Sequence, residues 1–404
     1  MKNSKPIVIL THVVNSAALQ GFLPAAVELG YSVLLLTDYP LEHQRYFTRE
    51  GLPGYPVEIL SCDVFNSQAI IELLQQWPQS PAAIFTNSDH LQTSCAQAAE
   101  FFNLPAKDWQ VCYRAKNKSA MREYLQANEI PTAWFQAITN IAELVNEDIP
   151  FPCVVKPQQG VASLDVQRCD DREQLIAFCK KFWRQQPNRS LIIEEFLVGS
   201  LFTLETLGDG KRLFALGGFD VTLSAPPYFI ETEACWQSDI DSEHCKQALE
   251  QLKQFGINFG VCHSEFVLTE QGPRLIEINY RSIGDNREFL LNRLASFDWF
   301  KQIMRLHLGE PLDNIEPIKG QAVIRYFCAE QDGKLISLPD EFEQTSPYSI
   351  KLEHIRSIGD QIRLSRSNKD YLSILTAVTK DPAPDKLMQA LDNLDTRFRW
   401  EISA

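Results

Sequence analysis

Several common signatures are missing from this sequence of 404 residues, and each absence argues against a class of protein. The formal net charge is −14, so the chain lacks the basic excess that favours binding to nucleic acid or to an anionic membrane surface. No apolar run approaches the length of a membrane span. The first apolar run, PIVIL, is broken by Thr11 and His12, and no signal-peptide cleavage site follows it. We therefore predict a cytoplasmic protein whose main partner is neither nucleic acid nor a membrane.

Cysteine is present but lacks the spacing of a zinc site or a disulfide framework. None of the ten cysteines forms a C-x-x-C pair, and several lie in strand-like or helix-like runs such as PCVVKP and IAFCKKF. Small buried hydrophobic residues that stay reduced are the better interpretation. The cysteines are at positions 62, 95, 112, 153, 169, 179, 235, 245, 262 and 328.

Two glycine-rich fingerprints of nucleotide-binding proteins are also missing. The turn after the first strand, residues 11–15, has no Gly-x-Gly, which argues against a Rossmann dehydrogenase. The loop after Lys156 contains Gly160 and Ser163 but no Gly-Lys-Ser/Thr, so it is not a Walker A loop. A lysine that ends a strand ahead of a small, polar loop can still place an ammonium and backbone N–H groups around phosphates. Alone, this pattern is not specific.

Strand-like and helix-like segments alternate over residues 1 to about 112. Short runs rich in Val, Ile and Leu, such as YSVLLLTD and AAIFTN, alternate with helical patterns such as NSQAIIELLQQW. This order predicts a mostly parallel sheet with helices on its faces. Asp38 and Asp89 follow strands, so we expect them at the carboxyl edge of the sheet, where ligands usually bind.

The middle and end of the chain mix helices and strands. Asn117 can cap a helix that begins at Lys118, and Arg122 follows one turn later on the same face. Two solvated charges are the alternative to a phosphate site at this helix. The segment DNREFLLNRLASFDWFKQIMRLHLG is predicted to be helical, and the pattern becomes strand-rich from about residue 318.

The stretch from Cys262 to Arg281 predicts two strands joined by a tight turn. A three-residue loop at 270–272, with Gly272 available for a positive φ, would place Glu265 opposite Glu277. Facing carboxylates repel each other, which makes sense where a cation lies between them. Two carboxylates and the amide oxygen of Asn279 are hard ligands that suit Mg²⁺, and a solvated sheet edge is the alternative. The opposite, core face of this hairpin would hold Phe266, Leu268, Ile276 and Ile278.

These signals occur in an order that resembles the ATP-grasp superfamily of carboxylate–amine ligases. The order begins with the doubly wound front part and continues through Lys118, Lys156, Glu194, Glu205, Glu265, Glu277, Asn279 and Arg281. Within the superfamily the chain is most similar to the L-amino acid ligases, over essentially all of its length, and LIEINYRSIGD is the most specific part. D-alanine–D-alanine ligases would show Pro near position 281, and biotin carboxylases a Gln-Val-Glu-His run shortly after it; the sequence has neither.

The resemblance implies an α/β (α+β) class and an ATP-grasp fold. It implies an N-terminal doubly wound, Rossmann-like domain at residues 1–112 and an ATP-grasp domain at 113–310, with a lid at about 133–195. Residues 311–404 would form a strand-rich C-terminal subdomain like that of biotin carboxylase, which completes the core. A homodimer is common among similar proteins.

The resemblance also implies roles for individual residues. The implied ATP contacts are Lys118, Lys156, Gly160, Ser163, Glu194, Glu195, Leu197, Glu265 and Glu277. The loop 158–163 would close over the phosphates, while Glu265, Glu277 and Asn279 would bind one or two Mg²⁺ (or Mn²⁺) ions. Arg281 and Lys156 would be catalytic, with Arg281 stabilising the transferred phosphoryl group. Candidates for substrate recognition are Glu205, Glu231, His263, Arg281 and Asp89, and all of these except Arg281 are also candidates for the base that deprotonates the amine. Leu201 stands where the family usually has a glutamate for the ribose hydroxyls.

The implied reaction uses ATP to convert a small carboxylate into an acyl phosphate and then couples it to an amine or amino acid. Such amide or peptide bonds occur in dipeptide, siderophore and other secondary-metabolite synthesis. Two alternatives remain: a carboxylase that activates bicarbonate, and a nucleotide-binding regulatory protein that has lost catalysis. The missing Gln-Val-Glu-His run counts against the first, and the presence of both lysines and of all three candidate metal ligands counts against the second.

Overall fold

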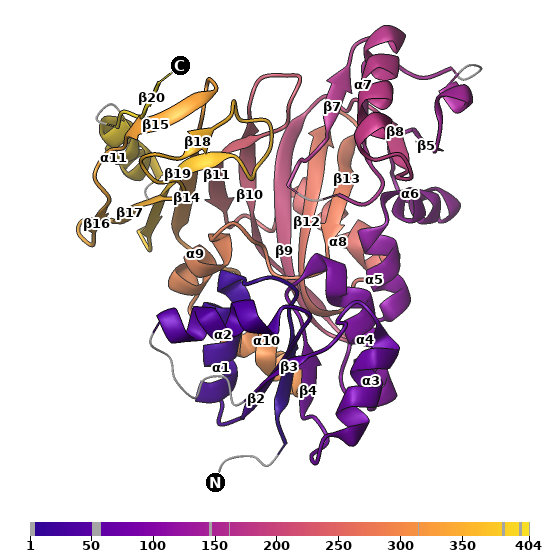
Figure 1. Ribbon diagram of the computed structural model, residues 1–404, viewed down its shortest axis with the longest axis vertical. Coiled ribbons are helices and arrows are strands. Elements are labelled where there is room, and N and C mark those ends of the chain that lie inside the picture. Colours follow the sequence, from indigo (N-terminus) through magenta and orange to yellow (C-terminus); the bar gives the residue numbers. More distant parts are fainter. Residues whose placement is uncertain are drawn as a thin grey trace.

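A computed structural model describes residues 5–50, 58–144, 148–160, 162–313, 315–381, 384–395 and 398–403. In Figure 1 the N-terminal α/β part lies at the bottom and a large antiparallel sheet occupies the centre. A smaller sheet with helix α7 stands at the upper right, and the C-terminal strands lie at the upper left. None of the described helices is both long and apolar enough to cross a membrane.

The chain begins with a parallel sheet in the order β3-β2-β1-β4. β1 and β2 are buried along their whole length, which explains their unbroken runs of Val, Ile and Leu. The predicted alternation of strands and helices is confirmed. The elements are β1 (Ile7–Leu10), η1 (Ala17–Phe22), α1 (Leu23–Glu28), β2 (Val33–Thr37), α2 (Pro40–Arg49), β3 (Glu58–Ser61), α3 (Ser67–Gln76), β4 (Ala83–Phe85), η2 (Asp89–Leu91), α4 (Gln92–Phe101) and α5 (Trp109–Lys116).

A second, antiparallel sheet follows in the order β5-β8-β6-β7. It packs against α7 around a hydrophobic core of its own, which includes Val155, Leu175, Phe182 and Ile193. The elements of this part are α6 (Lys118–Ala127), β5 (Phe135–Ile138), η3 (Ile141–Leu144), β6 (Cys153–Pro157), β7 (Gln167–Cys169), α7 (Arg172–Gln185) and β8 (Leu191–Glu195).

The large antiparallel sheet runs through the rest of the protein. Over the described residues it has nine strands in the order β13-β12-β9-β10-β11-β14-β19-β17-β16. Its elements, with α8, are β9 (Ser200–Asp209), β10 (Leu213–Leu223), β11 (Glu231–Gln237), α8 (Glu243–Phe255), β12 (Phe259–Thr269), β13 (Gly272–Asn279), β14 (Gln321–Cys328), β16 (Phe342–Gln344), β17 (Ser349–His354) and β19 (Tyr371–Thr379). A small sheet and three helices complete the structure: β15 (Gly333–Ser337), β18 (Gln361–Ile362), β20 (Glu401–Ser403), α9 (Arg287–Leu294), α10 (Trp299–His307) and α11 (Pro384–Asp395).

The helical segment predicted after Arg281 is two helices rather than one. α9 ends before Ala295, whose backbone is extended, and α10 begins after Asp298, whose side chain accepts a hydrogen bond from Lys301 N. α10 packs between the N-terminal part and the large sheet, where the Phe300 ring lies edge-on to Phe22 with centroids 5.0 Å apart. This helix therefore fixes the first part of the chain against the sheet.

The hairpin of β12 and β13 differs from its prediction in two ways that cancel. The turn has two residues, because Thr269 pairs with Gly272, which has a φ of +96°. The register then shifts by one between Phe266 and Glu265, so Glu265 lies opposite Glu277 as predicted. Because of this bulge, one prediction is wrong: Ile276, expected on the core face of the hairpin, lines a cavity on the opposite face. Leu275 takes its place in the core.

Close contact between β9 and β10 depends on Gly218. A Cβ at this position would lie 1.8 Å from the backbone oxygen of Thr203, so Gly218→Ala must push two paired strands apart. We expect this substitution to lower the free energy of unfolding by roughly 1–3 kcal/mol, measured by urea denaturation. Gly160→Ala is the control, because its nearest atom would be 3.6 Å away. Equal losses in the two variants would contradict this account of the sheet.

Candidate functional site

Two cavities lie next to each other on one face of the large sheet. The first, of about 380 Å³, is lined by residues of the small lid-like sheet and of β9 to β13. The second, of about 320 Å³, is lined by the same face and by the carboxyl edge of the N-terminal sheet. Both cavities are lined by Ser163, Glu231, Glu265 and Glu277. The two facing carboxylates of the hairpin therefore stand where the cavities meet.

The structure brings most of the predicted site residues together. Every residue predicted to contact ATP lines the first cavity: Lys118, Lys156, Gly160, Ser163, Glu194, Glu195, Leu197, Glu265 and Glu277. Asn279 and most of the candidate substrate residues line the second cavity: Asp89, Glu231, His263 and Arg281. Glu205 lines neither, because it is fully buried beneath His263. Val161, which belongs to the predicted phosphate loop, lies outside the described residues.

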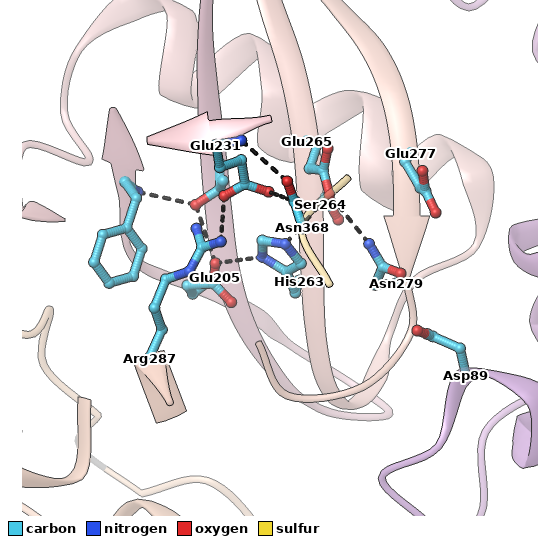
Figure 2. A network of polar contacts seen from close by, with 12 residues as sticks. Asp89, Glu205, Glu231, His263, Ser264, Glu265, Glu277, Asn279, Arg287 and Asn368 are labelled. Atoms are coloured by element: carbon cyan, nitrogen blue, oxygen red, sulfur yellow. Dashed lines mark hydrogen bonds and ion pairs between the residues drawn. The ribbon is translucent and has the colours of Figure 1, made fainter. Parts of the chain in front are cut away.

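Each of the two facing carboxylates has polar partners. Lys118 Nζ lies 3.2 Å from Glu277 Oε2. Glu265 lies on the neighbouring strand, β12. Its Oε1 is 3.6 Å from His263 Nε2 and accepts a hydrogen bond from Asn279 Nδ2 at 3.4 Å (Figure 2). Lys118 is only 6% exposed, so the alternative of a solvated charge at this helix is wrong.

The donor set at the hairpin suits a hard cation but does not complete its coordination. Among the described residues no group of three or more His, Cys, Asp or Glu side chains is placed to hold a metal ion. Two carboxylates leave most of the octahedral positions of Mg²⁺ open, which is the usual arrangement where nucleotide phosphates and water supply the remaining ligands. Asn279 directs its oxygen at Arg281 Nη2, 3.5 Å away, rather than at Glu265. The fit is therefore to a metal ion that arrives with a nucleotide.

Glu194 is the centre of a buried charge network. Its Oε1 accepts from Arg122 Nε at 2.8 Å, and its Oε2 accepts from Arg122 Nη2 at 3.1 Å and from Lys156 Nζ at 2.7 Å. Burial alone would raise the pKa of this carboxyl, but the two cations outweigh it and lower the pKa to about 2. Arg122 is fully buried, so it too is no solvated charge. Both oxygens of Glu194 are engaged, whatever else the residue contacts.

His263 and Glu205 form a second buried pair on neighbouring strands. His263 Nδ1 lies 2.6 Å from Glu205 Oε1, which also accepts from Thr203 Oγ1 at 3.1 Å. Burial disfavours the charged imidazole, but Glu205 outweighs it and raises the pKa of His263 to about 9. His263 is thus a cation at neutral pH that connects Glu205, in the sheet, to Glu265 at the cavity junction (Figure 2).

Arg281 is held by the N-terminal sheet. Asp89 follows β4 at the carboxyl edge of that sheet, and its Oδ2 accepts from Arg281 Nε at 2.8 Å and lies 2.7 Å from Nη2. The neighbouring Ser282 N donates to Asn87 Oδ1 at 3.0 Å. Although burial opposes it, the guanidinium lowers the pKa of Asp89. The ion pair with Asp89, which follows a strand of the N-terminal sheet, therefore fixes Arg281 in the second cavity.

Sequence reasoning missed two residues that hold Glu231. Arg287 Nη2 pairs with Glu231 Oε2, and Asn368 Nδ2 donates to Glu231 Oε1 at 3.0 Å (Figure 2). Asn368 N also donates to the backbone oxygen of Ala162 in the phosphate loop, at 3.1 Å. Arg287 could have been found as a cation near the end of the LIEINYRSIGD motif. Asn368 is 137 residues from Glu231, and nothing in the local sequence points to it.

Comparison with known proteins shows which family and which fold this chain is similar to. Residues 149–288 match the model of the ATP-grasp domain family. The crystal structure of an L-amino acid ligase from Bacillus licheniformis superposes with a TM-score of 0.79 at 18% identity and covers 100% of both chains. This likeness confirms the predicted fold.

Two curated proteins are related in sequence. An uncharacterized protein of Sinorhizobium fredii is 26% identical over 371 residues, which are 86% of this chain and 74% of that protein. A phosphoribosylamine–glycine ligase of Streptococcus suis is 24% identical over 325 residues, which are 71% of this chain and 75% of that enzyme.

The network around Glu194 should dominate the stability of the first cavity. Glu194→Gln leaves Arg122 and Lys156 buried without their counter-charge, so we expect a loss of roughly 3–5 kcal/mol in the free energy of unfolding at pH 7, measured by urea denaturation. The low folded-state pKa stabilises the wild type above about pH 4.5, and that stabilisation is lost as the pH falls towards 2. The difference between wild type and variant should therefore narrow in acid.

Glu195→Gln is the matched control for this prediction. Its Oε1 accepts a hydrogen bond from Trp134 N but makes no ion pair with any described residue, so the loss should be smaller. A Glu194→Gln variant as stable as the Glu195→Gln variant would refute the proposed importance of the network.

Proposed function

Because residues 149–288 are an ATP-grasp domain within a chain that has the fold of the ATP-grasp ligases, we propose that this protein is an ADP-forming carboxylate–amine ligase. It would activate a small carboxylate as an acyl phosphate and couple it to an amine or amino acid. One observation carries the proposal: the two cavities meet at Glu265 and Glu277. A nucleotide in the first can present its terminal phosphate to a carboxylate in the second.

The first cavity has the surfaces that ATP needs. Apolar side chains, among them Val154, Phe196, Leu197 and Leu201, offer contacts for a base and a sugar. Lys118 contacts Glu277, so one ammonium stands at the junction where phosphates would lie. Leu201 gives the ribose hydroxyls no carboxylate, which leaves nucleotide binding to apolar contacts and phosphates.

The reaction would proceed in two displacements. A carboxylate oxygen attacks the γ-phosphorus and ADP leaves; an amine then attacks the acyl carbon and phosphate leaves. Lys118, Lys156 and Arg281 would neutralise the charge that moves between these oxygens, and removal of one such preorganised contact typically costs roughly 3–4 kcal/mol in the transition state. When bound, Mg²⁺ (or Mn²⁺) would supply further positive charge to the phosphates; Glu265 and Glu277 would hold it, and Asn279 would join them once its side-chain oxygen turns from Arg281.

An acyl phosphate must be protected from water, and the phosphate loop is the candidate for this role. Ala162 and Ser163 adopt left-handed backbone conformations, with φ of +56° and +53°. These are uncommon for residues with a side chain, and a contact to Asn368 N holds the loop through the oxygen of Ala162. We infer that this contact closes the lid over the junction during the reaction.

Asn368→Ala tests this closure. The substitution removes the two hydrogen bonds to Glu231 that position the backbone of residue 368 under the loop. We expect more phosphate released per amide formed, because water reaches the acyl phosphate, with a ratio several-fold above that of the wild type. Phosphate and product are measured in the same reaction. Lys369→Ala, at the exposed neighbouring position, is the control, and an unchanged ratio in Asn368→Ala would exclude the role.

The function itself is tested by incubation with ATP, Mg²⁺ and pooled amino acids, carboxylates and amines. We expect ADP and an amide product, identified by mass spectrometry, and a hydroxamate when hydroxylamine traps the acyl phosphate. Glu277→Gln should abolish Mg²⁺-dependent ADP formation while the protein stays folded.

Three outcomes would contradict this proposal. Retained turnover in Glu277→Gln would remove the metal assignment. ADP release that requires bicarbonate would favour the carboxylase alternative, and absence of both ADP and hydroxamate across the pool would favour a regulatory protein. The homodimer and the cytoplasmic location stay predictions.

A further inference from the structure

The acidic residues of the second cavity fall into two groups. Six carboxylates line it, and four of them lie within 4 Å of a cationic side chain. These pairs are Asp89 with Arg281, Glu231 with Arg287, Glu265 with His263, and Glu277 with Lys118. Asp285 and Glu288 make no such ion pair within the described part of the chain. Two of the six carboxyl groups therefore have no positively charged partner among the described residues.

Glu288 is the more unusual of the two, because it is buried. It is 4% exposed, it lines the cavity, and its Oε2 has no hydrogen-bond partner among the described residues. Burial raises the pKa of this carboxyl to about 8, and Asp285 acts in the same direction, while Arg281 and Arg287 oppose it. A buried acceptor without a partner is costly, so its persistence in a cavity needs an explanation.

The local backbone places this carboxyl in the cavity. Asp285 and Asn286 both have left-handed conformations, with φ of +58° and +68°, and Asn286 precedes the first residue of α9. The chain thus turns sharply after Gly284, and Glu288 falls in the first turn of the helix. Arg287, next to it, points to Glu231 instead (Figure 2). Arg287 therefore completes an ion pair, whereas Glu288 keeps one oxygen without a hydrogen-bond partner among the described residues.

A ligand that satisfies Glu288 must donate a hydrogen bond and should carry positive charge. A neutral amide or hydroxyl would pair with the carboxyl of Glu288 but leave Glu288 and Asp285 without a counter-charge, whereas a cation beside them would also lower the pKa of Glu288 and favour its charged form. A primary ammonium supplies three donors and one positive charge in a small volume. The cations of the cavity cannot take this place, because Arg281 and Arg287 are already paired with Asp89 and Glu231.

We propose that Glu288, with the exposed Asp285 beside it, binds the ammonium group of an amino-acid or amine substrate. The proposal rests on the ligase function and adds to it the place where the substrate is recognised. The ammonium can belong to the amino acid that gives its carboxylate or to the amine that attacks, since both present the same group.

The second case also accounts for the proton that the amine must lose. One N–H bond of the ammonium breaks and an O–H bond forms on the Glu288 carboxylate; the freed nitrogen lone pair attacks the acyl carbon, the bond from that carbon to the phosphate oxygen breaks, and the departing phosphate takes the second proton from the nitrogen. The four candidates from the sequence serve this step less well. Asp89 and Glu231 are paired with arginines, His263 lies between Glu205 and Glu265, and Glu205 lies outside the cavity.

Glu288→Gln keeps the shape of the side chain and removes its charge. In the first arm, hydroxylamine, largely uncharged at neutral pH, replaces the amine, and hydroxamate is measured with the preferred amino acid and with its analogue lacking the amino group. If the ammonium of the carboxylate donor binds Glu288, the variant should raise the KM of the amino acid at least tenfold. The KM values of the analogue and of ATP should stay within twofold.

In the second arm the acceptor is varied at a fixed carboxylate donor. If the attacking amine binds Glu288, hydroxamate formation should be unchanged in the variant, while kcat/KM for the amine acceptor falls at least tenfold. Glu310→Gln, at an exposed position far from both cavities, is the matched control and should behave as wild type in both arms. Changes below twofold in both arms of Glu288→Gln would overturn the ammonium site and leave the ligase function standing.

Two further measurements separate this proposal from failure of the ligase function or of folding. If the wild type forms neither ADP nor hydroxamate, calorimetric titration of single amino acids into the wild type and the Glu288→Gln variant tests the ammonium site directly. Binding at least tenfold weaker in Glu288→Gln supports it, and equal binding overturns it. Thermal unfolding at pH 7 should show the variant to be no less stable, because a neutral amide costs no more to bury than a carboxyl without a partner.

Discussion

Two like charges held face to face are the constraint on which the rest of this site depends. Glu265 and Glu277 are directly opposite on β12 and β13, where bare carboxylates would destabilise the hairpin. The positive charges that compensate these carboxylates come from different parts of the chain. Lys118 comes from the start of α6, and His263 comes from β12 itself with Glu205 of β9 behind it. The parts of the protein must therefore assemble around the hairpin before its charges are balanced, which ties formation of the candidate site to formation of the fold.

Much of this centre could be predicted because its residues are close in sequence or on regular elements. Within one hairpin the alternation of side chains decides which residues share a face, so Glu265, Glu277 and Asn279 could be grouped without a structure. Even in this hairpin, the predicted pairing of Glu265 with Glu277 was correct although the predicted turn was not. The turn is one residue shorter than expected and a bulge restores the count, so only Ile276 was assigned to the wrong face. A capping residue and helical spacing likewise placed Lys118 and Arg122 together.

Contacts between distant elements could not be predicted in the same way. Arg122 and Glu194 are 72 residues apart, and only the packing of α6 against β8 and β13 shows that they neutralise each other rather than face water. Glu205 alternates correctly along β9, but the sequence does not say that His263 will cover it. Asn368 reaches the site through a turn in the C-terminal part. In each case local pattern fixes the direction of a side chain along its own element, while tertiary packing decides what it meets.

The two cavities differ in a way that fits a division of tasks. In the first cavity the buried charges neutralise one another: Glu194 has both oxygens engaged, and Lys118 already contacts Glu277. Such a site is preorganised and suits a partner that is always the same molecule, as ATP would be under the proposed function. In the second cavity one buried carboxyl stays unsatisfied. The free energy that this costs is recovered only when a ligand with the right donor arrives, so a ligand without that donor is rejected by an unpaired polar group as well as by poor fit. An incomplete hydrogen-bond set in the second cavity is therefore a physical means of selecting the substrate that the sequence alone does not name.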